Sequence, residues 1–333
     1  MIAAVLFAAA AAVPSAAASP PLPDEIREIA RSACGTVGVA AAAVESGERF
    51  SLRGGERFPM MSVYKLPIAL ALLHSVEEGK ASLDEKIEIR PSDLRLGNSP
   101  IADRHPEGGV TLTVRELLED TLIESDNTAS DILLREAGGG AAVTARLRAL
   151  GVEGIRVDRP EAWLAFDGAG IRDAPPEAAW TLAGLRRLFD AQPPEEKARA
   201  IRAFVEDPRD TATPDAMVDL LVLLARGKAV DASNTARVIN LMARTKTGAA
   251  RIMARLPMET PVVHRTGLSM TVGGFTAAIN DVGLVSPPDG PRFAIAVFVK
   301  GCGRPVPEAE DAIARIARAA YDRFAAARAP ASP

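Results

Sequence analysis

The chain has 333 residues, with 39 Lys and Arg against 43 Asp and Glu, so its formal net charge is −4. This balance argues against a basic protein built to bind nucleic acid, and 48% hydrophobic residues exclude wholesale disorder. Two cysteines and three histidines (His74, His105 and His264) are too few for a cysteine-type zinc module, and the sequence has no glycine-rich phosphate loop. We therefore expect a globular protein that needs no metal or cofactor and has no nucleic-acid partner.

The first residues have the pattern of an export signal. Ile2–Val13 are almost wholly apolar, a run shorter than the ~20 residues that span a bilayer, and Ala16–Ala18 fit a cleavage site. We predict a signal peptide over residues 1–18 and a periplasmic or secreted bacterial protein with no stable membrane insertion; a disordered alanine-rich tail is the alternative. Export would permit a disulfide between Cys34 and Cys302, but two buried free thiols also fit the sequence.

Strand patterns gather near both ends of the chain. Apolar residues predict strands over residues 36–44, 49–52, 261–266, 275–285 and 292–300. A short helix near Pro23 and a final helix over 307–327 flank them. Phe293–Val299 is apolar at every position, so we expect this strand to be covered on both faces by the two terminal helices.

The middle of the chain is predicted to be helical. Helices are expected over residues 62–78, 128–137, 176–191, 194–206, 214–226 and 233–244. Another helix begins at the capping box Thr113–Glu116. The helix over 128–137 should end at Gly138–Gly140. The layout predicts an α+β fold, in which residues 19–58 and 244–333 form a sheet domain and residues 59–243 form an all-helical domain.

Ser62 and Lys65 could carry chemistry. Residues i and i+3 share one face of a helix, and Lys65 is followed by apolar residues. Desolvation lowers the pKa of an amine, which would let Lys65 act as a base toward the Ser62 hydroxyl. The chain has only 7 lysines against 32 arginines, so a lysine in an apolar setting is informative. A chance Ser-x-x-Lys is the alternative, expected in about one such chain in three.

Two further motifs hold polar groups at element junctions. Ser125-Asp126-Asn127 lies between two apolar helices, where it is either a helix cap or a loop that projects a hydroxyl and an amide into a cleft. Lys246-Thr247-Gly248 resembles a helix C-terminus, whereas Arg265-Thr266-Gly267 follows a strand and could bind a substrate carboxylate. We prefer the second Thr-Gly pair.

In this order, the three motifs resemble those of the serine β-lactamases and penicillin-binding proteins. Arg156–Glu161 resembles the start of the omega loop of class A β-lactamases. Ser99-Pro100, Thr128-Ala129 and Asn280–Gly283 also resemble that class, and the resemblance covers nearly all of the mature chain. It implies a β-lactamase-like fold: an antiparallel sheet flanked by terminal helices, with an all-helical domain.

The resemblance also implies roles for individual residues. Ser62 would be the acylated nucleophile, Lys65 and Glu161 would share its proton, Glu161 would activate the deacylating water, and Ser125 would protonate the β-lactam nitrogen. The substrate would be held by a further set of residues: Asn127 for its amide, Arg265, Thr266, Gly267 and Arg251 for its carboxylate, and the backbone N–H groups of Ser62 and Leu268 for the oxyanion.

The chain departs from the family pattern at several positions. Ala165 and Asp131 stand where asparagines are usual, which puts the hydrolytic water and the omega-loop conformation in question. About 50 residues separate Glu161 from Asp210, which should pair with Arg159. We therefore expect an enlarged omega loop with a helical insertion over about 166–206.

The packing face of this insertion should comprise Trp180, Leu185, Leu188, Ile201, Phe204 and Val205. An earlier Arg172-Asp173 could replace Asp210 in the ion pair with Arg159, and the insertion could be a surface decoration.

The resemblance implies a monomeric, secreted class A-like β-lactamase that hydrolyses a small-molecule β-lactam through an acyl-Ser62 ester. Two alternatives share the first three motifs. One is a D-Ala-D-Ala peptidase or related penicillin-binding serine hydrolase, and the other is a penicillin sensor that is acylated without turnover.

Overall fold

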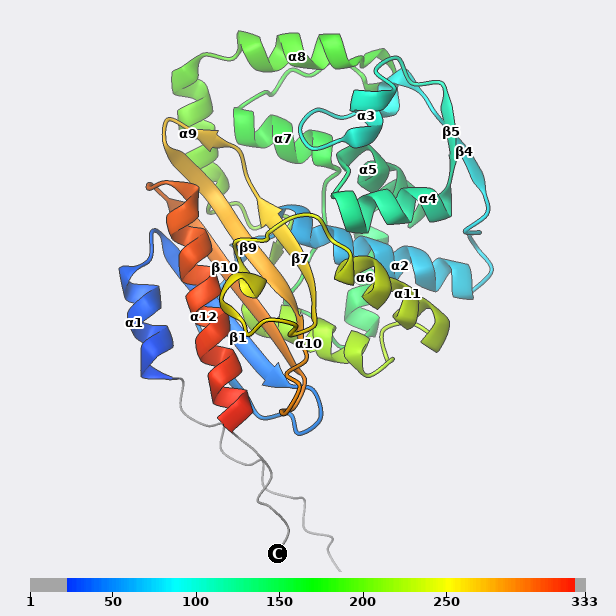
Figure 1. The fold of residues 1–333 in the computed structure, drawn as a ribbon. Helices are drawn as coiled ribbons and strands as arrows, with labels where there is room; N and C mark the ends of the chain where they lie inside the picture. The colour runs from blue at the N-terminus through cyan, green and yellow to red at the C-terminus, as the bar shows by residue number, and fades with distance from the viewer. Residues whose placement is uncertain (1–22, 327–333) are drawn as a thin grey trace, which may run out of the picture.

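A computed structural model describes residues 23–326 of the chain, so the predicted signal peptide lies outside the described residues. Its main sheet is antiparallel, and five of its strands follow the order β2-β1-β10-β9-β7. These strands are β1 (Thr36–Ala43), β2 (Arg49–Leu52), β7 (Val262–Leu268), β9 (Phe275–Val285) and β10 (Phe293–Cys302), and the short β8 (Thr271–Val272) pairs with β9. The α+β architecture predicted from the sequence is confirmed, because the two ends of the chain meet in one sheet (Figure 1).

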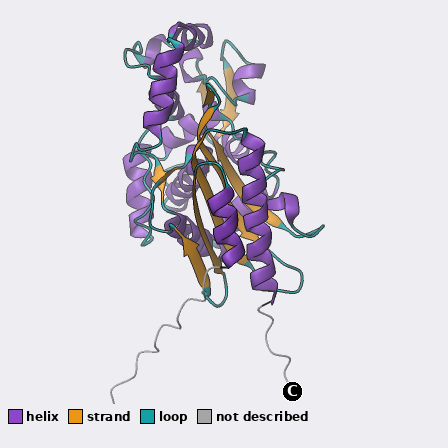
Figure 2. Cartoon of the chain, turned by 90° about the vertical axis from the view of Figure 1, so that its left-hand side faces the viewer, coloured by secondary structure: helices purple, strands orange, loops and turns teal. Residues whose placement is uncertain are grey.

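The two faces of β10 are covered by different parts of the chain. Side chains alternate along a strand, and Ile295 and Val297 pack with the cluster under α12 (Val306–Ala326). Ala296 and Phe298 belong instead to the core shared with the helical part. Both terminal helices lie on the same face of the sheet (Figure 2). The expectation that they cover both faces is therefore wrong, since the other face packs on a helix from the middle of the chain.

That helix is α10 (Pro214–Ala225), which contacts β1, β9 and β10. The helical part surrounds α2 (Lys65–Glu77), whose first nine residues are all buried. A helix that is apolar on every side needs neighbours on every side, and α5 (Asn127–Glu136) and α6 (Gly139–Ala149) supply two of them. The same part of the chain also contains α3 (Pro100–Arg104), α4 (Val114–Glu119) and α11 (Ala232–Ala243).

Two short strand pairs complete the scaffold. The first joins β3 (Phe58–Pro59) to β6 (Thr211–Ala212), and the second joins β4 (Lys86–Ile89) to β5 (Val110–Thr113). The predicted capping box at Thr113 is confirmed, because its hydroxyl accepts the Glu116 N–H at 3.2 Å while Glu116 accepts the Thr113 N–H at 2.7 Å.

Residues 161–204 form three helices at the top of Figure 1, namely α7 (Glu161–Ala169), α8 (Leu182–Ala191) and α9 (Pro194–Phe204). The predicted packing face is confirmed: Trp180, Leu185, Ile201 and Phe204 are at most 5% exposed. Leu188 and Val205 are partly buried against the same clusters.

Three local predictions need correction. Gly138, with φ at +88°, does end α5, but helix α6 resumes at once from Gly139. The helix expected from residue 176 begins only at Leu182, after a 3₁₀ turn. The stretch before Lys65 is also a 3₁₀ turn, η1 (Met61–Tyr64), so Ser62 precedes α2 rather than lying in it.

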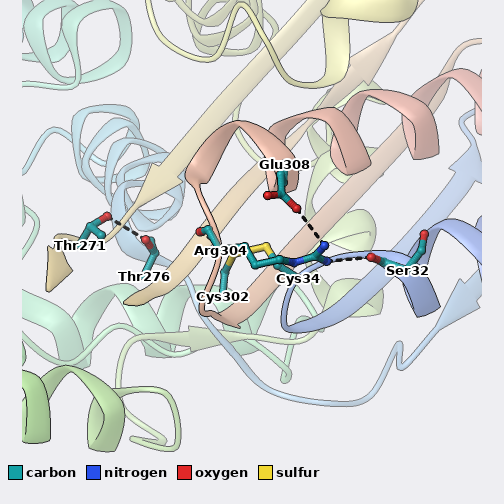
Figure 3. The surroundings of a disulfide bond; sticks show 7 residues. All are labelled: Ser32, Cys34, Thr271, Thr276, Cys302, Arg304 and Glu308. Atoms are coloured by element: carbon teal, nitrogen blue, oxygen red, sulfur yellow. Dashed lines mark hydrogen bonds and ion pairs between the residues drawn. A yellow bond between two sulfur atoms is a disulfide. The ribbon is translucent and has the colours of Figure 1, made fainter. Parts of the chain in front are cut away.

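The two cysteines form a disulfide between residues 268 positions apart in the chain. It ties Cys34, just after α1 (Asp24–Ser32), to Cys302 at the end of β10 (Figure 3). Arg304 braces the same corner, because its guanidinium donates to Ser32 O at 2.8 Å and pairs with Glu308 at 2.8 Å. The alternative of two free thiols is therefore excluded.

Candidate active site

Lys65 lies at the centre of a buried polar cluster. Its Nζ donates to Ser125 O and to Asn127 Oδ1, both at 2.7 Å, and lies 3.3 Å from Glu161 Oε1. Ser125 Oγ and Asp126 O lie farther away, both at 3.4 Å, so Nζ is surrounded by acceptors, which suits an ammonium ion. Burial lowers the pKa of Lys65 to about 8, although the Glu161 carboxylate opposes that shift.

Glu161 is the first residue of α7, where its backbone N–H is held by Asp131. The Asp131 Oδ1 accepts that N–H at 2.6 Å, and its other oxygen takes a hydrogen bond from Arg95 Nε at 2.5 Å. Burial raises the pKa of Glu161, the Lys65 ammonium lowers it, and the Asp131 charge raises it further. Asp131, at the position where the family pattern has asparagine, therefore orients Glu161 and also affects its charge.

Ser125 has a left-handed backbone conformation, with φ at +64°, at the end of a π turn over Asp120–Glu124. Such a conformation is strained for a residue with a side chain and is common at functional sites. The Asp126 carboxylate stabilises the turn by capping α5, since it accepts the Ala129 N–H at 2.9 Å and the Ile101 N–H at 2.8 Å. Ser125-Asp126-Asn127 is thus both a helix cap and part of the cluster around Lys65.

Arg265 contacts Ser125 and is fully buried. Its guanidinium donates to Ser125 Oγ, to Ser62 O at 3.1 Å and to Leu122 O at 3.1 Å. Burial lowers the pKa of Arg265 to about 10, so the side chain is still a cation at neutral pH. The strand β7 therefore places its positive charge directly against the Ser125 hydroxyl.

These elements meet at a pocket of about 520 Å³. Its lining includes Ser62 from η1, Asn127 from α5, Glu161 and Ala165 from α7, and Leu268 from β7. The structure thus brings together residues of separate sequence motifs, which lie as far apart in the chain as Ser62 and Leu268.

A family model described as the beta-lactamase enzyme family matches residues 21–324 of this chain. The chain belongs to that family. The extended-spectrum β-lactamase PER-1 of Pseudomonas aeruginosa is 29% identical over 308 residues, which cover 92% of this chain and 88% of PER-1. The β-lactamase VEB-1 of the same organism is 31% identical over 278 residues, covering 83% and 81% of the two chains. A β-lactamase crystal structure from Chitinophaga pinensis is 34% identical, with a TM-score of 0.74 and coverage of 90% and 98%.

The predicted relation to class A β-lactamases is therefore confirmed, and this chain is a hydrolase of that class. Members of the class hydrolyse the β-lactam amide. In the described part of the chain, residues 23–326, no helix is long and apolar enough to cross a membrane, and no cluster of three His, Cys, Asp or Glu side chains could hold a metal ion.

Arg251 does not lie where the β-lactamase pattern suggested. Its side chain is 4% exposed and donates to Asn280 O at 2.9 Å and Gly267 O at 3.2 Å, and it pairs with Glu310 at 3.1 Å. Neither Arg251 nor the fully buried Arg265 is among the residues that line the pocket. In this structure Arg251 supports the backbone of β7 at Gly267.

Thr247, which sequence reasoning set aside, lies beside the predicted site residue Thr266. Its hydroxyl lies 2.6 Å from the hydroxyl of Thr266, so both Thr-Gly pairs meet in space. Gly248 allows this approach, because a Cβ there would lie 2.3 Å from Thr266 Cγ2. Lys246 turns away and pairs with Glu124. The Thr247-Gly248 dipeptide was the feature of the sequence that could have pointed to Thr247.

Gly267 has a steric role in the same strand. A Cβ at this position would lie 2.3 Å from Met60 O, so only glycine lets β7 pack against the turn that carries Ser62. Arg159 pairs with Asp210 at 2.6 Å, as predicted, and with Asp207 at 3.0 Å, so the alternative partner Asp173 is wrong. These ion pairs close the segment that carries α7, α8 and α9.

The histidines take three different environments. His264 is buried on β7, where its Nδ1 lies 2.9 Å from Asp281 Oδ1. His74 lies at the end of α2 beside Glu77, and His105 follows α3. None of the three lines the pocket.

Proposed function

We propose that this protein is a serine β-lactamase that forms an acyl ester on Ser62 and hydrolyses it with a water activated by Glu161. The observation that carries the proposal is the position of Glu161. This buried carboxylate lies 3.3 Å from the Lys65 amine and lines the same pocket as Ser62. A base is thus available for both the formation and the hydrolysis of an ester.

In acylation, the Ser62 Oγ attacks the β-lactam carbonyl carbon, and its proton passes by way of the Lys65 ammonium ion to the Glu161 carboxylate. The C–N bond then breaks, and the ring nitrogen receives the proton of Ser125 Oγ. Arg265 donates a hydrogen bond to that oxygen, which stabilises negative charge on it as the proton leaves. Lys65 Nζ lies 3.4 Å from Ser125 Oγ and can return a proton.

The substrate oxyanion would be held by the backbone N–H groups of Ser62 and Leu268. Ser269 N–H donates to Ala278 O on β9 at 3.0 Å, and successive residues of an edge strand point to opposite sides. The Leu268 N–H therefore faces away from β9, which supports this role.

The other substrate contacts would belong to Asn127 and Thr266. The Asn127 amide would bind the acyl amide of the substrate, and Thr266 would bind its carboxylate, with the buried Arg265 supplying positive charge from behind Ser125. Arg251 would contribute by supporting β7 at Gly267.

In deacylation, Glu161 takes a proton from water, the water oxygen bonds to the ester carbon, and Ser62 leaves with a proton. Ala165 lines the pocket on the same helix and brings no amide to the water. Glu161 therefore carries more of the positioning of this water. The disulfide supports export to an oxidising compartment, and we propose a monomer that acts there.

The test is to follow a penicillin adduct by mass spectrometry. We expect the wild type to turn over, Glu161→Gln to accumulate the acyl ester for minutes or longer, and Ser62→Ala to form none. General-base catalysis is typically worth about 10²–10⁴-fold, which sets the scale of the defect in Glu161→Gln. The matched control is Glu153→Gln, because Glu153 is exposed and does not line the pocket.

A wild type that holds the adduct as long as Glu161→Gln does would contradict the proposal. That result would favour the peptidase or the penicillin sensor. An adduct on Ser62→Ala would move the nucleophile elsewhere.

A further inference from the structure

The pocket that holds Ser62 extends well beyond the catalytic cluster. Its outer wall is formed by residues from α7, α8, α9 and the turn after β7. These are Leu164, Arg186, Phe189, Ile201, Phe204 and Met270. Helices α8 and α9 therefore contribute directly to the pocket and are more than a surface decoration.

The wall rests on fixed aromatic packing. Phe166 of α7 lies 5.3 Å from the Trp180 ring and 5.8 Å from the Phe189 ring, between ring centroids. On the neighbouring helix α9, the Phe204 ring lies 5.5 Å from the guanidinium of Arg159, which precedes α7. Side chains mounted on packed helices form a defined surface, which can discriminate between ligands by shape.

Among the residues that the structure describes, the pocket lining contains one basic and one acidic side chain. Arg186 is the one cationic side chain that lines the pocket in the described part of the chain. The one acid there is Glu161, which is paired with Lys65. Within residues 23–326, the exposed Arg186 forms no ion pair. Its guanidinium can therefore serve a ligand anion at the end of an otherwise apolar wall.

The position of this wall relative to Ser62 indicates which part of a substrate would reach it. If Asn127 binds the acyl amide and β7 binds the ring carboxylate, the acyl substituent continues toward α7 and α8. We propose that α8 and α9 form a subsite for β-lactams whose acyl substituent has an apolar or aromatic body and ends in a carboxylate bound by Arg186. This inference rests on the proposed β-lactamase function.

The test compares three penicillins that share one nucleus. 6-Aminopenicillanic acid has no acyl substituent, benzylpenicillin has an aromatic one, and carboxybenzylpenicillin adds a carboxylate. The readout is kcat/KM for each compound, taken as ratios within one preparation. Such ratios cancel any loss of folded enzyme.

We expect Arg186→Ala to lower the ratio of kcat/KM for carboxybenzylpenicillin to that for benzylpenicillin roughly 5-fold, because the ion pair between Arg186 and the substrate carboxylate is exposed to solvent. Arg186→Glu should lower that ratio further. Arg187→Ala is the matched control and should leave it unchanged, because the exposed Arg187 does not line this pocket. Phe189→Ala should lower the benzyl-to-unsubstituted ratio roughly 10-fold.

The outcomes separate this inference from the function on which it rests. If the wild type hydrolyses none of the three compounds, the proposed function fails. If it hydrolyses them and both ratios are unchanged in the Arg186 and Phe189 variants, the function stands and the subsite is refuted. The subsite would also be refuted if Arg187→Ala changed the ratio as much as Arg186→Ala does, because the positive charge of α8 would then act only at long range.

Discussion

The state of charge of the Lys65–Glu161 pair decides what the site can do. Lys65 Nζ donates to Ser125 O and Asn127 Oδ1 and lies 3.3 Å from the Glu161 carboxylate, an arrangement of acceptors that suits an ammonium ion. Glu161 must be a carboxylate to accept a proton from water. The form that hydrolyses the ester is therefore the ion pair, which exists only between the two pKa values of the coupled groups.

This pair predicts a bell-shaped dependence of kcat on pH. Burial raises the pKa of Glu161, so activity should rise with pH through a value above the ordinary range for Glu. The pKa of Lys65 is lowered to about 8, so activity should fall as pH rises through about 8. The measurement is steady-state hydrolysis of one penicillin from pH 4 to pH 10. A rate that stays level up to pH 10 would contradict the assignment of the ammonium form.

Spacing in the sequence could identify Ser62 and Lys65, because residues three apart in a helical turn share a face whatever surrounds them. It could not tell where Arg251 and Arg265 point. A long side chain follows the packing around it, and Arg251 donates to backbone carbonyls that only the folded sheet brings near. Similarly, Thr247 and Thr266 meet only after the helical part and β7 have packed together.

At the scale of elements, Arg95 links three parts of the helical region. It neutralises Asp131 of α5, which holds the first N–H of α7. It also pairs with Glu177 at 2.8 Å and lies 5.1 Å from the centroid of Trp180. Both residues precede α8. The orientation of Glu161 therefore depends on a buried ion pair that also anchors the segment leading into α8.

We predict that Arg95→Met will leave the Asp131 carboxylate uncompensated beside Glu161. Breaking a buried pair costs about 3–5 kcal/mol, and a displaced base should slow deacylation roughly 10- to 100-fold. The acid limb of the pH profile should move to higher pH, because the Asp131 charge raises the pKa of Glu161. The measurements are urea unfolding and the decay of the acyl adduct.

The double variant Arg95→Met with Asp131→Asn serves as the control. Asn keeps an oxygen for the Glu161 N–H and removes the unpaired charge, so most of the stability and rate should return. A double variant as slow as the single one would mean that Arg95 acts by packing alone.

Helix α6 shows where element prediction from sequence fails. Three successive glycines favoured an end to the helix, and Gly138 does provide one. Gly140 serves a different purpose, since a Cβ there would lie 2.7 Å from Val157 O. It lets α6 lie against the segment that leads to Glu161. A glycine kept for close packing looks the same in sequence as one kept for a turn.

For the molecule as a whole, the sheet joins the two ends of the chain around the helical middle. The strands were predictable because β1, β9 and β10 are long apolar runs. Their neighbours were not predictable from composition, because both faces of β10 are equally apolar. In the folded sheet, Val297 of β10 pairs with Val39 of β1 and Asp281 of β9. Alternate residues of β10 then pack into two different hydrophobic clusters, one on each face of the sheet.

The disulfide acts at this largest scale, because it closes a loop between residues 268 positions apart that contains the helical part and most of the sheet. Cross-linking so long a loop restricts the unfolded chain, and such bonds typically contribute about 2–5 kcal/mol. We predict that the double variant Cys34→Ser with Cys302→Ser will unfold at lower urea than the oxidised wild type. Its kcat at 25 °C should be unchanged, because neither cysteine lines the pocket.

The measurement is urea unfolding of both proteins with and without a thiol reductant. Reductant should move the wild-type midpoint down to that of the double variant and leave the variant where it is. The reason is that the bond acts through the unfolded chain, so its loss lowers the free energy of unfolding without rearranging the site. Equal midpoints for the oxidised wild type and the double variant would show that packing between α1, β10 and α12 already holds this corner without the disulfide.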